Sequence, residues 1–257
     1  MLKITDTKRL KMTWRFLKKK CGEYFSISKK YKEFKALSVR SGNRFSVEWQ
    51  DVFFLSGEDT ATTGFNIPYV YHTGWAARVL ARTRPSVHYD ISSWLAFTSI
   101  TSAFIPIKFY DFRPANLKLS NIATGKADLT SLPFANNSIG SISCMHTIEH
   151  IGLGRYGDPV DPNGDLKAIR ELIRVTKKGG DLLFVVPVGK PKICFNSHRT
   201  YSYAQIMEYF KDLELKEFFL IPDDAIALKE GPIENATEED ADRQTLGCGC
   251  FWFRKTN

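Results

Sequence analysis

The chain has 257 residues, which is enough for one large domain or for one domain with an appendage. Hydrophobic residues make up 43% of it and charged residues 25%, so a disordered or collagen-like chain is excluded. The formal net charge of +8 is uneven, because residues 1–44 carry 14 basic and 3 acidic side chains. The remaining chain is slightly acidic. This asymmetry argues against a nucleic-acid groove spread over the whole fold and confines such binding to a basic arm.

The basic leader has the apolar spacing of a helix. Leu10, Trp14, Leu17, Cys21 and Tyr24 recur at intervals of three and four residues, with lysines and arginines between them. One interpretation is a peripheral helix that attaches to an anionic membrane or an acidic partner. The other is a helix that packs on the rest of the protein with its basic face in solvent. The sequence thus predicts a leader and connecting or lid segment over 1–66, followed by a domain over 67–257.

The cysteines and apolar runs bear on location and metal binding. Five cysteines, an odd number, in a chain of this size favour reduced thiols and a cytoplasmic protein. No pair has zinc-finger spacing, so Cys248 and Cys250 are expected to be structural and no metal site is predicted. The N-terminus lacks the apolar core of a signal peptide. The uncharged run 91–107 is interrupted by hydroxyl residues and Pro106, so we expect a buried helix leading into a strand.

From residue 69 onward, helical and extended patterns alternate. Helices are predicted over 69–80, with Trp75 in the core, and over 164–176 and 202–210. The acidic run 234–242 is expected to be an exposed loop. Short apolar strands are predicted over residues 87–91, 107–111, 139–145, 181–188, 215–220 and 248–254. This order predicts a three-layer, Rossmann-like α/β sandwich with a mostly parallel sheet.

Acidic residues follow the first strands in a pattern that suits a nucleoside. Asp90 ends the first strand and Asp111 ends the second, where a carboxylate can accept hydrogen bonds from both ribose hydroxyls. Asp128 and Leu129 follow at an interval that suits a turn beside an adenine. The strand 139–145 then delivers His146, Glu149 and His150 at its end.

This order of motifs resembles the class I S-adenosylmethionine-dependent methyltransferases over about 85–188. The segment 149–165 (EHIGLGRYGDPVDPNGD), followed by PVGKP and FNSHRTYS, is similar to a branch known mainly as a domain of unknown function. In bacteria that branch often accompanies surface-polysaccharide genes. The resemblance implies S-adenosylmethionine as cofactor and a small or glycan-linked acceptor with a hydroxyl, amine or phosphorylated group. Fold analogy alone does not supply a function.

The expected glycine-rich cofactor turn is missing. Ser92 and Trp94 stand where the resemblance leads us to expect glycines, so Trp94 should turn its side chain toward the helix and the core. A modified but competent turn, with Asp90, Ser92 and Ser93 at the cofactor, is one reading. A catalytically silent scaffold that binds a partner is the other. A dinucleotide dehydrogenase fits less well, because a pyrophosphate needs the glycine-rich turn even more.

Candidate catalytic and acceptor-binding residues follow from position and chemistry. His146 and His150 are candidate bases, with Glu149 beside them; the alternative is that they cap the following loop. Arg199 could hold a phosphate or a carboxylate, or form an internal ion pair. The candidates for acceptor binding are His72, Arg155, Tyr156, His198, Arg199 and Tyr201.

The membrane interpretation of the leader can be tested with vesicles. Anionic vesicles should retain the full-length protein at low salt and release it as salt rises, because mobile ions screen exposed charges. Co-sedimentation across a salt series measures this, with neutral vesicles as the control. If anionic vesicles never retain the protein, the interpretation as a packed helix stands.

Overall fold

The computed structural model describes residues 6–223, 229 and 231–256. The chain divides into two compact units, Met1–Phe65 and Asn66–Asn257. In the first, helix α1 (Asp6–Arg40) confirms the expected leader helix, and a short 3-10 turn, η1 (Trp49–Asp51), follows it. The side chain of Leu10 lies outside the described part of the chain. No described helix is long and apolar enough to cross a membrane.

Aromatic contacts hold the segment after α1 against this helix. Tyr24 stacks on Phe54 with ring centroids 5.4 Å apart, and Tyr31 meets Trp49 edge-on at 5.0 Å. Trp14, Leu17 and Tyr24 nevertheless keep about half or more of their surface exposed in this unit. Both interpretations of the leader therefore stay open.

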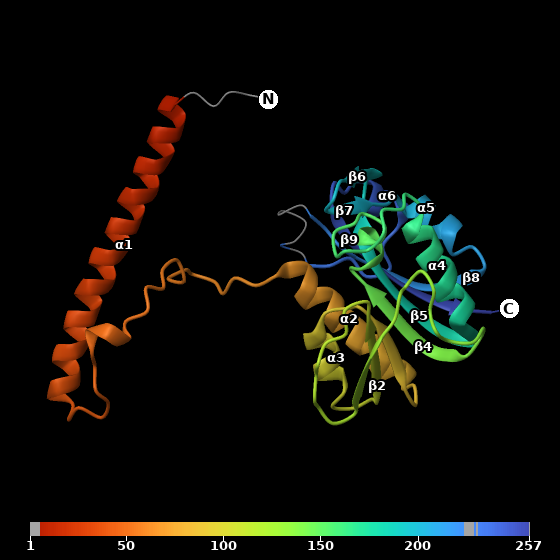
Figure 1. Ribbon diagram of the computed structural model, residues 1–257, viewed down its shortest axis with the longest axis horizontal. Coiled ribbons are helices and arrows are strands. Elements are labelled where there is room, and N and C mark those ends of the chain that lie inside the picture. The colour runs from red at the N-terminus through yellow and green to blue at the C-terminus, as the bar shows by residue number, and fades with distance from the viewer. Residues whose placement is uncertain (1–5, 224–228, 230, 257) are drawn as a thin grey trace. The chain divides into compact units, whose positions relative to one another are not determined.

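The second unit is built on a seven-stranded sheet with the order β3-β2-β1-β4-β5-β9-β8 (Figure 1). Strands β1 to β5 pair in parallel, and β9 is antiparallel to both of its neighbours. A separate two-stranded ribbon pairs β6 (Lys192–Cys194) with β7 (His198–Thr200). The seven strands are β1 (His88–Ile91), β2 (Ile107–Asp111), β3 (Ile122–Lys126), β4 (Ile139–Met145), β5 (Thr176–Val188), β8 (Leu213–Ile221) and β9 (Gly247–Lys255).

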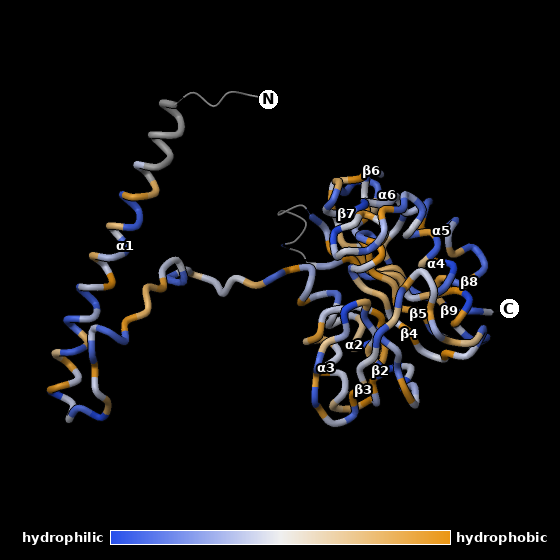
Figure 2. The backbone as a smooth tube through the Cα atoms, in the orientation of Figure 1, coloured by the Kyte–Doolittle hydropathy of each residue, from blue (hydrophilic) through white to orange (hydrophobic). Residues whose placement is uncertain are grey.

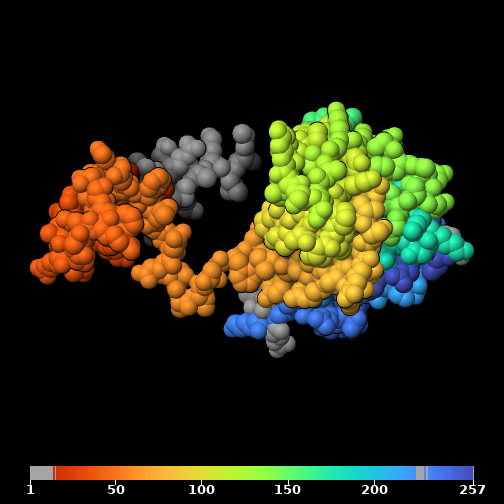
Figure 3. Space-filling view, turned by 90° about the horizontal axis from the view of Figure 1, so that it is seen from below, coloured from red at the N-terminus to blue at the C-terminus, as the bar shows by residue number. Residues whose placement is uncertain are grey.

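Helices cover both faces of this sheet, as expected for a three-layer sandwich. Helices α2 (Ile67–Thr83) and α3 (Leu95–Thr101) pack on one face, and Figure 3 shows the surface of this side in orange to yellow-green. Helices α4 (Gly164–Val175), α5 (Tyr203–Tyr209) and α6 (Glu238–Asp242) pack on the other face. The predicted fold class is confirmed.

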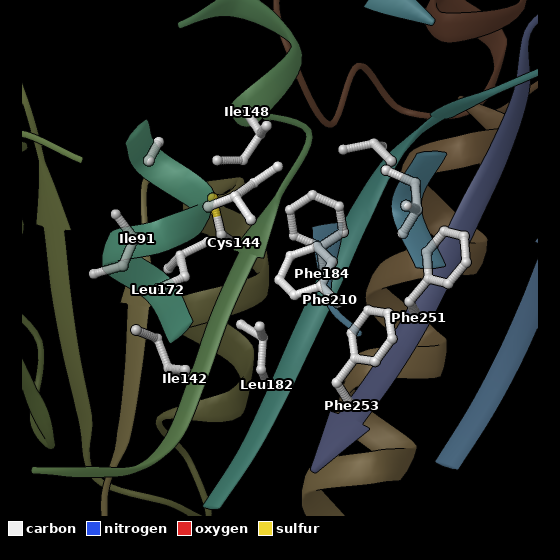
Figure 4. Close-up of a cluster of buried hydrophobic side chains, with 14 of the residues drawn as sticks. Ile91, Ile142, Cys144, Ile148, Leu172, Leu182, Phe184, Phe210, Phe251 and Phe253 are labelled. Carbon is white, nitrogen blue, oxygen red and sulfur yellow. The ribbon is translucent and has the colours of Figure 1, made fainter. Parts of the chain in front are cut away.

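The central strands are apolar on both faces, which is why they lie in the middle of the sheet (Figure 2). Along β5, Phe184 and Val186 face α4 and α5, whereas Leu183 and Val185 face α2. Aromatic side chains pack together between the sheet and helices α4 and α5 (Figure 4). The rings of Phe184 and Phe210 lie 4.7 Å apart.

The sequence analysis missed three strands and misassigned one segment. Strand β3 (IATGK) is polar and lies at the sheet edge, and β6 and β7 are only three residues long. The expectation of an exposed loop over 234–242 was wrong for 238–242, where α6 forms, whereas residues 234–237 are a mostly exposed loop. Thr237 caps this helix in a capping box with Asp240, and Ala241 is buried. Trp75 lies in the core as predicted.

The aromatic layer should dominate the stability of the second unit. Phe184→Ala removes a fully buried ring and should lower the free energy of unfolding by about 3–5 kcal/mol. Phe195→Ala is the control, because Phe195 is 74% exposed and its truncation should change little. Urea unfolding followed by circular dichroism compares them, and equal stability of the two variants would contradict this description of the core.

Candidate active site

The strand order reverses between β1 and β4. The sheet continues from β1 to β2 and β3 on one side, and from β4 to β5, β9 and β8 on the other. In open α/β sheets, ligands bind beyond the carboxyl ends of the strands at such a point. Ser92 follows β1, Asp111 ends β2 and His146 follows β4. All three line a cavity here, which confirms that the predicted strand ends come together.

A first cavity of about 370 Å³ lies over the ends of β1, β2 and β4. Asp111 accepts a hydrogen bond from the backbone N–H of Arg113 at 2.7 Å through one carboxylate oxygen. Asp128 accepts from the backbone N–H and the hydroxyl of Thr130 at 2.8 and 2.7 Å. Leu129 is buried in the wall. Asp111, Asp128 and an apolar wall thus face this cavity, which Asp158 and Asp161 also line.

A second cavity of about 420 Å³ adjoins the first. Ser92, His146, His150 and Tyr156 line both, so the two spaces meet at these side chains. The second cavity combines aromatic, basic and acidic groups. Its other lining residues include Tyr69, Ser93, Trp94, Glu149, Arg155, His198 and Cys248.

The turn after β1 uses serine in a backbone conformation that favours glycine. Ser92 has φ +59°, which costs a residue with a Cβ about 1–2 kcal/mol. Its N–H donates to the carbonyl of Tyr110 at 2.8 Å, and its own carbonyl accepts from the Thr147 hydroxyl at 3.0 Å. The expectation for Trp94 was wrong. This residue caps α3 in an extended conformation, and its 47% exposed side chain lies at the second cavity.

Asp90 lies beneath the cavities, inside a buried polar network. Its carboxylate accepts from the N–H of Ser93 at 3.1 Å and from the hydroxyl of Ser143, which also contacts His88. The Ser93 hydroxyl accepts from the N–H of Met145 at 3.1 Å. Asp90 therefore lines neither cavity, and Ser93 lines only the second. These two predicted cofactor residues instead tie β1 to β4.

Burial sets the protonation of this network. It raises the pKa of Asp90 to about 6, although the hydrogen bonds from Ser143 and Ser93 oppose the rise. Burial also lowers the pKa of His88 to about 3, so the imidazole is neutral.

Behind the junction of the cavities, His146 joins Glu149 to Cys248. The Nδ1 of His146 lies 3.0 Å from the buried Glu149 carboxylate, and its Nε2 lies 3.2 Å from the Cys248 Sγ. Cys248 and Glu149 raise the pKa of His146 against the effect of burial. Burial opposes ionisation of the Cys248 thiol, but contacts with Cys250 and His146 lower its pKa. His146 itself has φ +53°.

His150 occupies a more open position than His146. Its Nδ1 lies 2.6 Å from the carbonyl oxygen of Ser197, to which it donates. Arg155 donates to the same carbonyl at 3.2 Å, and its guanidinium lies over the Tyr156 ring. His198 contacts the Ser197 hydroxyl at 2.9 Å. These side chains bring a basic group of residues to the second cavity.

Three predicted acceptor residues lie away from both cavities. Arg199 donates to the carbonyls of Ile151 and Pro162 and pairs with Asp165, to which Tyr201 also donates its hydroxyl at 3.0 Å. The internal ion pair is therefore the observed arrangement for Arg199. His72 is fully buried and stands behind His146.

The loop 152–164 lines the first cavity, beside the predicted cofactor residues. Gly152 has φ +80°, and a Cβ there would stand 2.1 Å from the carbonyl oxygen of Asp161. The N–H of Gly152 donates to the Asp158 carboxylate at 2.8 Å. A Cβ on Gly164 would approach the Cα of Gly152 to 3.0 Å. The loop is thus closed by direct backbone contact.

The sequence analysis missed Cys248 and Tyr69 as residues of this site. Cys248 is 102 positions from its partner His146, so no local spacing connects the two. Tyr69 stacks on His146 with centroids 5.6 Å apart and comes from the start of α2. Only the packing of α2 and β9 around the end of β4 brings them together.

Known structures share this architecture. The N-methyltransferase NodS from Bradyrhizobium japonicum, solved with S-adenosyl-L-homocysteine, has 14% identity and a TM-score of 0.51, with 74% of this chain and 87% of NodS covered. A Galdieria sulphuraria protein assigned as a sarcosine dimethylglycine methyltransferase has 16% identity and a TM-score of 0.52, with 73% and 85% covered. The fold is that of the class I methyltransferases.

Sequence comparison adds one family and no function. The family described as "Caenorhabditis protein of unknown function, DUF268" matches residues 125–247. This range includes the loop 152–164 and the histidines after β4. No protein with a curated function matches the chain by sequence.

The buried Asp90 should leave a signature in the pH dependence of stability. Its folded pKa lies above the ordinary value of 3.8, so the folded state holds the proton more tightly. The contribution of this proton to the free energy of unfolding is complete below pH 4. It is lost as pH rises through about 6, which lowers the free energy of unfolding by up to about 3 kcal/mol. Asp90→Asn, which cannot ionise, should remove this loss. Unfolding free energies of both proteins between pH 4 and 7 measure it, and parallel curves would contradict the assignment.

Proposed function

We propose that this protein is an S-adenosylmethionine-dependent methyltransferase. The observation that supports it is the pair of joined cavities at the strand-order reversal of a methyltransferase fold, with Asp111 and Asp128 on the first cavity. The first cavity is the proposed cofactor site. The second is the proposed acceptor site.

The donor chemistry of the first cavity fits the cofactor. Only one oxygen of the Asp111 carboxylate is hydrogen-bonded among the described residues, which leaves the other for the ribose hydroxyls. Asp128 and the apolar Leu129 suit the amino group and the face of an adenine. When bound, S-adenosylmethionine supplies a methyl group on a positively charged sulfur. Asp158, also on this cavity, adds negative charge that favours a cation, whereas Asp161 is paired with Lys167 at 2.7 Å.

The residues at the junction can orient an acceptor and take its proton. Methyl transfer depends mainly on holding the acceptor atom in line, so the walls shared by both cavities are the critical ones. His150 is the better base of the two histidines. Its Nδ1–H is fixed by the Ser197 carbonyl, which leaves Nε2 with a lone pair, whereas the His146 Nε2 is engaged by Cys248.

The second cavity suits an acceptor with an apolar or sugar ring and negative charge. Trp94 and Tyr69 offer ring faces, and Arg155 offers a guanidinium that can bind a phosphate or carboxylate. A glycan-linked or phosphorylated small molecule, as in polysaccharide synthesis, belongs to this class. The alternative function is a silent scaffold, which the serine at φ +59° and the Trp94 in the cofactor turn favour.

Cofactor binding separates the two functions. The native protein should bind S-adenosylmethionine, and Asp111→Asn should weaken binding about tenfold or more, because a hydrogen bond to a charged group is worth about 1.5–3 kcal/mol. Isothermal titration calorimetry with S-adenosylmethionine and S-adenosylhomocysteine measures both. Asp212→Asn is the matched control, since Asp212 is exposed and far in sequence from the cavity lining.

The outcomes distinguish the function from the residue assignment. If the native protein binds the cofactor and Asp111→Asn binds equally well, the role of Asp111 is wrong. If the folded native protein does not bind at millimolar cofactor, the scaffold function replaces the enzyme.

A further inference from the structure

Three side chains that bind metals in other proteins meet at the wall of the second cavity. His72 comes from α2, His146 follows β4 and Cys248 lies in β9. One potential ligand atom of each lies within 4.8 Å of the other two. His72 and Cys248 are buried and His146 is nearly so. Neither the fold nor the proposed methyl transfer accounts for this meeting.

His72 carries an unused lone pair in the interior. Its Nδ1 lies 2.7 Å from the carbonyl oxygen of Pro68, which can only accept, so the proton sits on Nδ1. Its Nε2 then presents a lone pair, is fully buried and has no partner among the described residues. Buried polar atoms in native proteins are satisfied in nearly all cases. This nitrogen can be satisfied by a hydrogen-bond donor or by a metal ion.

The remaining groups are arranged as metal ligands with their supporting partners. The Nδ1 of His146 donates to the Glu149 carboxylate, which directs Nε2 toward the Cys248 Sγ at 3.2 Å. A metal-binding histidine almost always donates its other N–H to a carboxylate or a backbone carbonyl. Both histidines show this pattern, His146 through Glu149 and His72 through Pro68.

We propose that His72 Nε2, His146 Nε2 and Cys248 Sγ bind a divalent transition metal ion, with zinc as the best match. Two imidazoles and one thiolate are ligands that zinc prefers. Tetrahedral bonds of about 2.0–2.3 Å would place ligand atoms about 3.3–3.8 Å apart. His146 Nε2 and Cys248 Sγ, 3.2 Å apart, are already close to this spacing, and all three ligand atoms lie within 4.8 Å of one another, so shifts of only about 1 Å are needed. This proposal does not depend on methyl transfer.

Charge and access support the site. One oxygen of the Glu149 carboxylate is buried without a partner among the described residues, and a cation nearby would offset its charge. His146 and Cys248 line the second cavity, whereas His72 is behind them. A fourth coordination position therefore faces that cavity. Three protein ligands with one open position are typical of zinc that binds water or a substrate atom.

A Cys248–His146–Glu149 nucleophile, without metal, is the competing use of the same atoms. A nucleophile of this kind needs a base and a group that orients the base, and both are present. It leaves the His72 lone pair unexplained. The metal site accounts for all three side chains, and the two ideas predict opposite behaviour of the thiol when zinc is added.

The test measures metal on the full-length protein. Purified protein stripped with a chelator and dialysed against zinc should retain one zinc per chain by elemental analysis. Cobalt should give a thiolate-to-metal absorption band. Chelator competition should show that Glu149→Gln weakens zinc about 10- to 100-fold and that Cys248→Ser and His72→Gln weaken it further. Cys194→Ser is the control, because Cys194 does not belong to the cluster or line either cavity, and it should keep native affinity.

Two further readouts keep the test decisive if a variant does not fold. Zinc should raise the midpoint of thermal unfolding of the native protein, because it binds the folded state. It should also protect Cys248 from iodoacetamide, followed on the peptide that contains it. Absence of the cobalt thiolate band, or a Cys248 that alkylates equally fast with and without zinc, would overturn the metal site and favour the nucleophile.

Discussion

The buried contacts between β1 and β4 are the constraint on which the rest of the site depends. The sheet reverses its strand order here, where β1 and β4 pair in parallel. Asp90, Ser93 and Ser143 supply those contacts below the cavities. Because these three side chains occupy the interior, Ser92 is the residue of the turn that reaches both cavities. Hydrogen bonds with Tyr110 and Thr147 fix the strained backbone of Ser92 from both sides. A carboxylate that sequence position suggests for a ligand thus serves the scaffold.

Sequence patterns predicted what depends on local periodicity. The apolar runs of β4 and β5 and the apolar side of α4 are strong, and they placed Asp111, Asp128 and His146 at one edge of the sheet correctly. Strand β3 was not predicted because an edge strand needs no apolar faces. The side chains of Asp90 and Arg199 were placed in the interior by contacts that no spacing encodes. The same holds for Cys248, which reaches His146 only through the antiparallel pairing of β9.

The two cavities differ in the kind of wall that surrounds them. The first is formed by strand ends, turns and the loop 152–164, and its charged groups on the β2 and β3 side are Asp111, Asp128 and Arg113. The second is formed by the start of α2, the turn 92–94, the segment after β4 and the start of β9, and it gathers rings, imidazoles and a guanidinium. A cation with a nucleoside suits the first, and an anionic or ring-shaped partner suits the second. His146 and His150 line both cavities and so lie between the two proposed ligands.

The contact between Gly152 and Gly164 gives the first cavity a boundary made of main chain alone. A single methyl group at Gly152 would occupy the space of the Asp161 carbonyl and force the loop open. Natural substitutions can therefore alter this cavity through the side chains that face it, but they cannot adjust the backbone contact between Gly152 and Gly164. The part of the site with no side chains is the part least free to evolve.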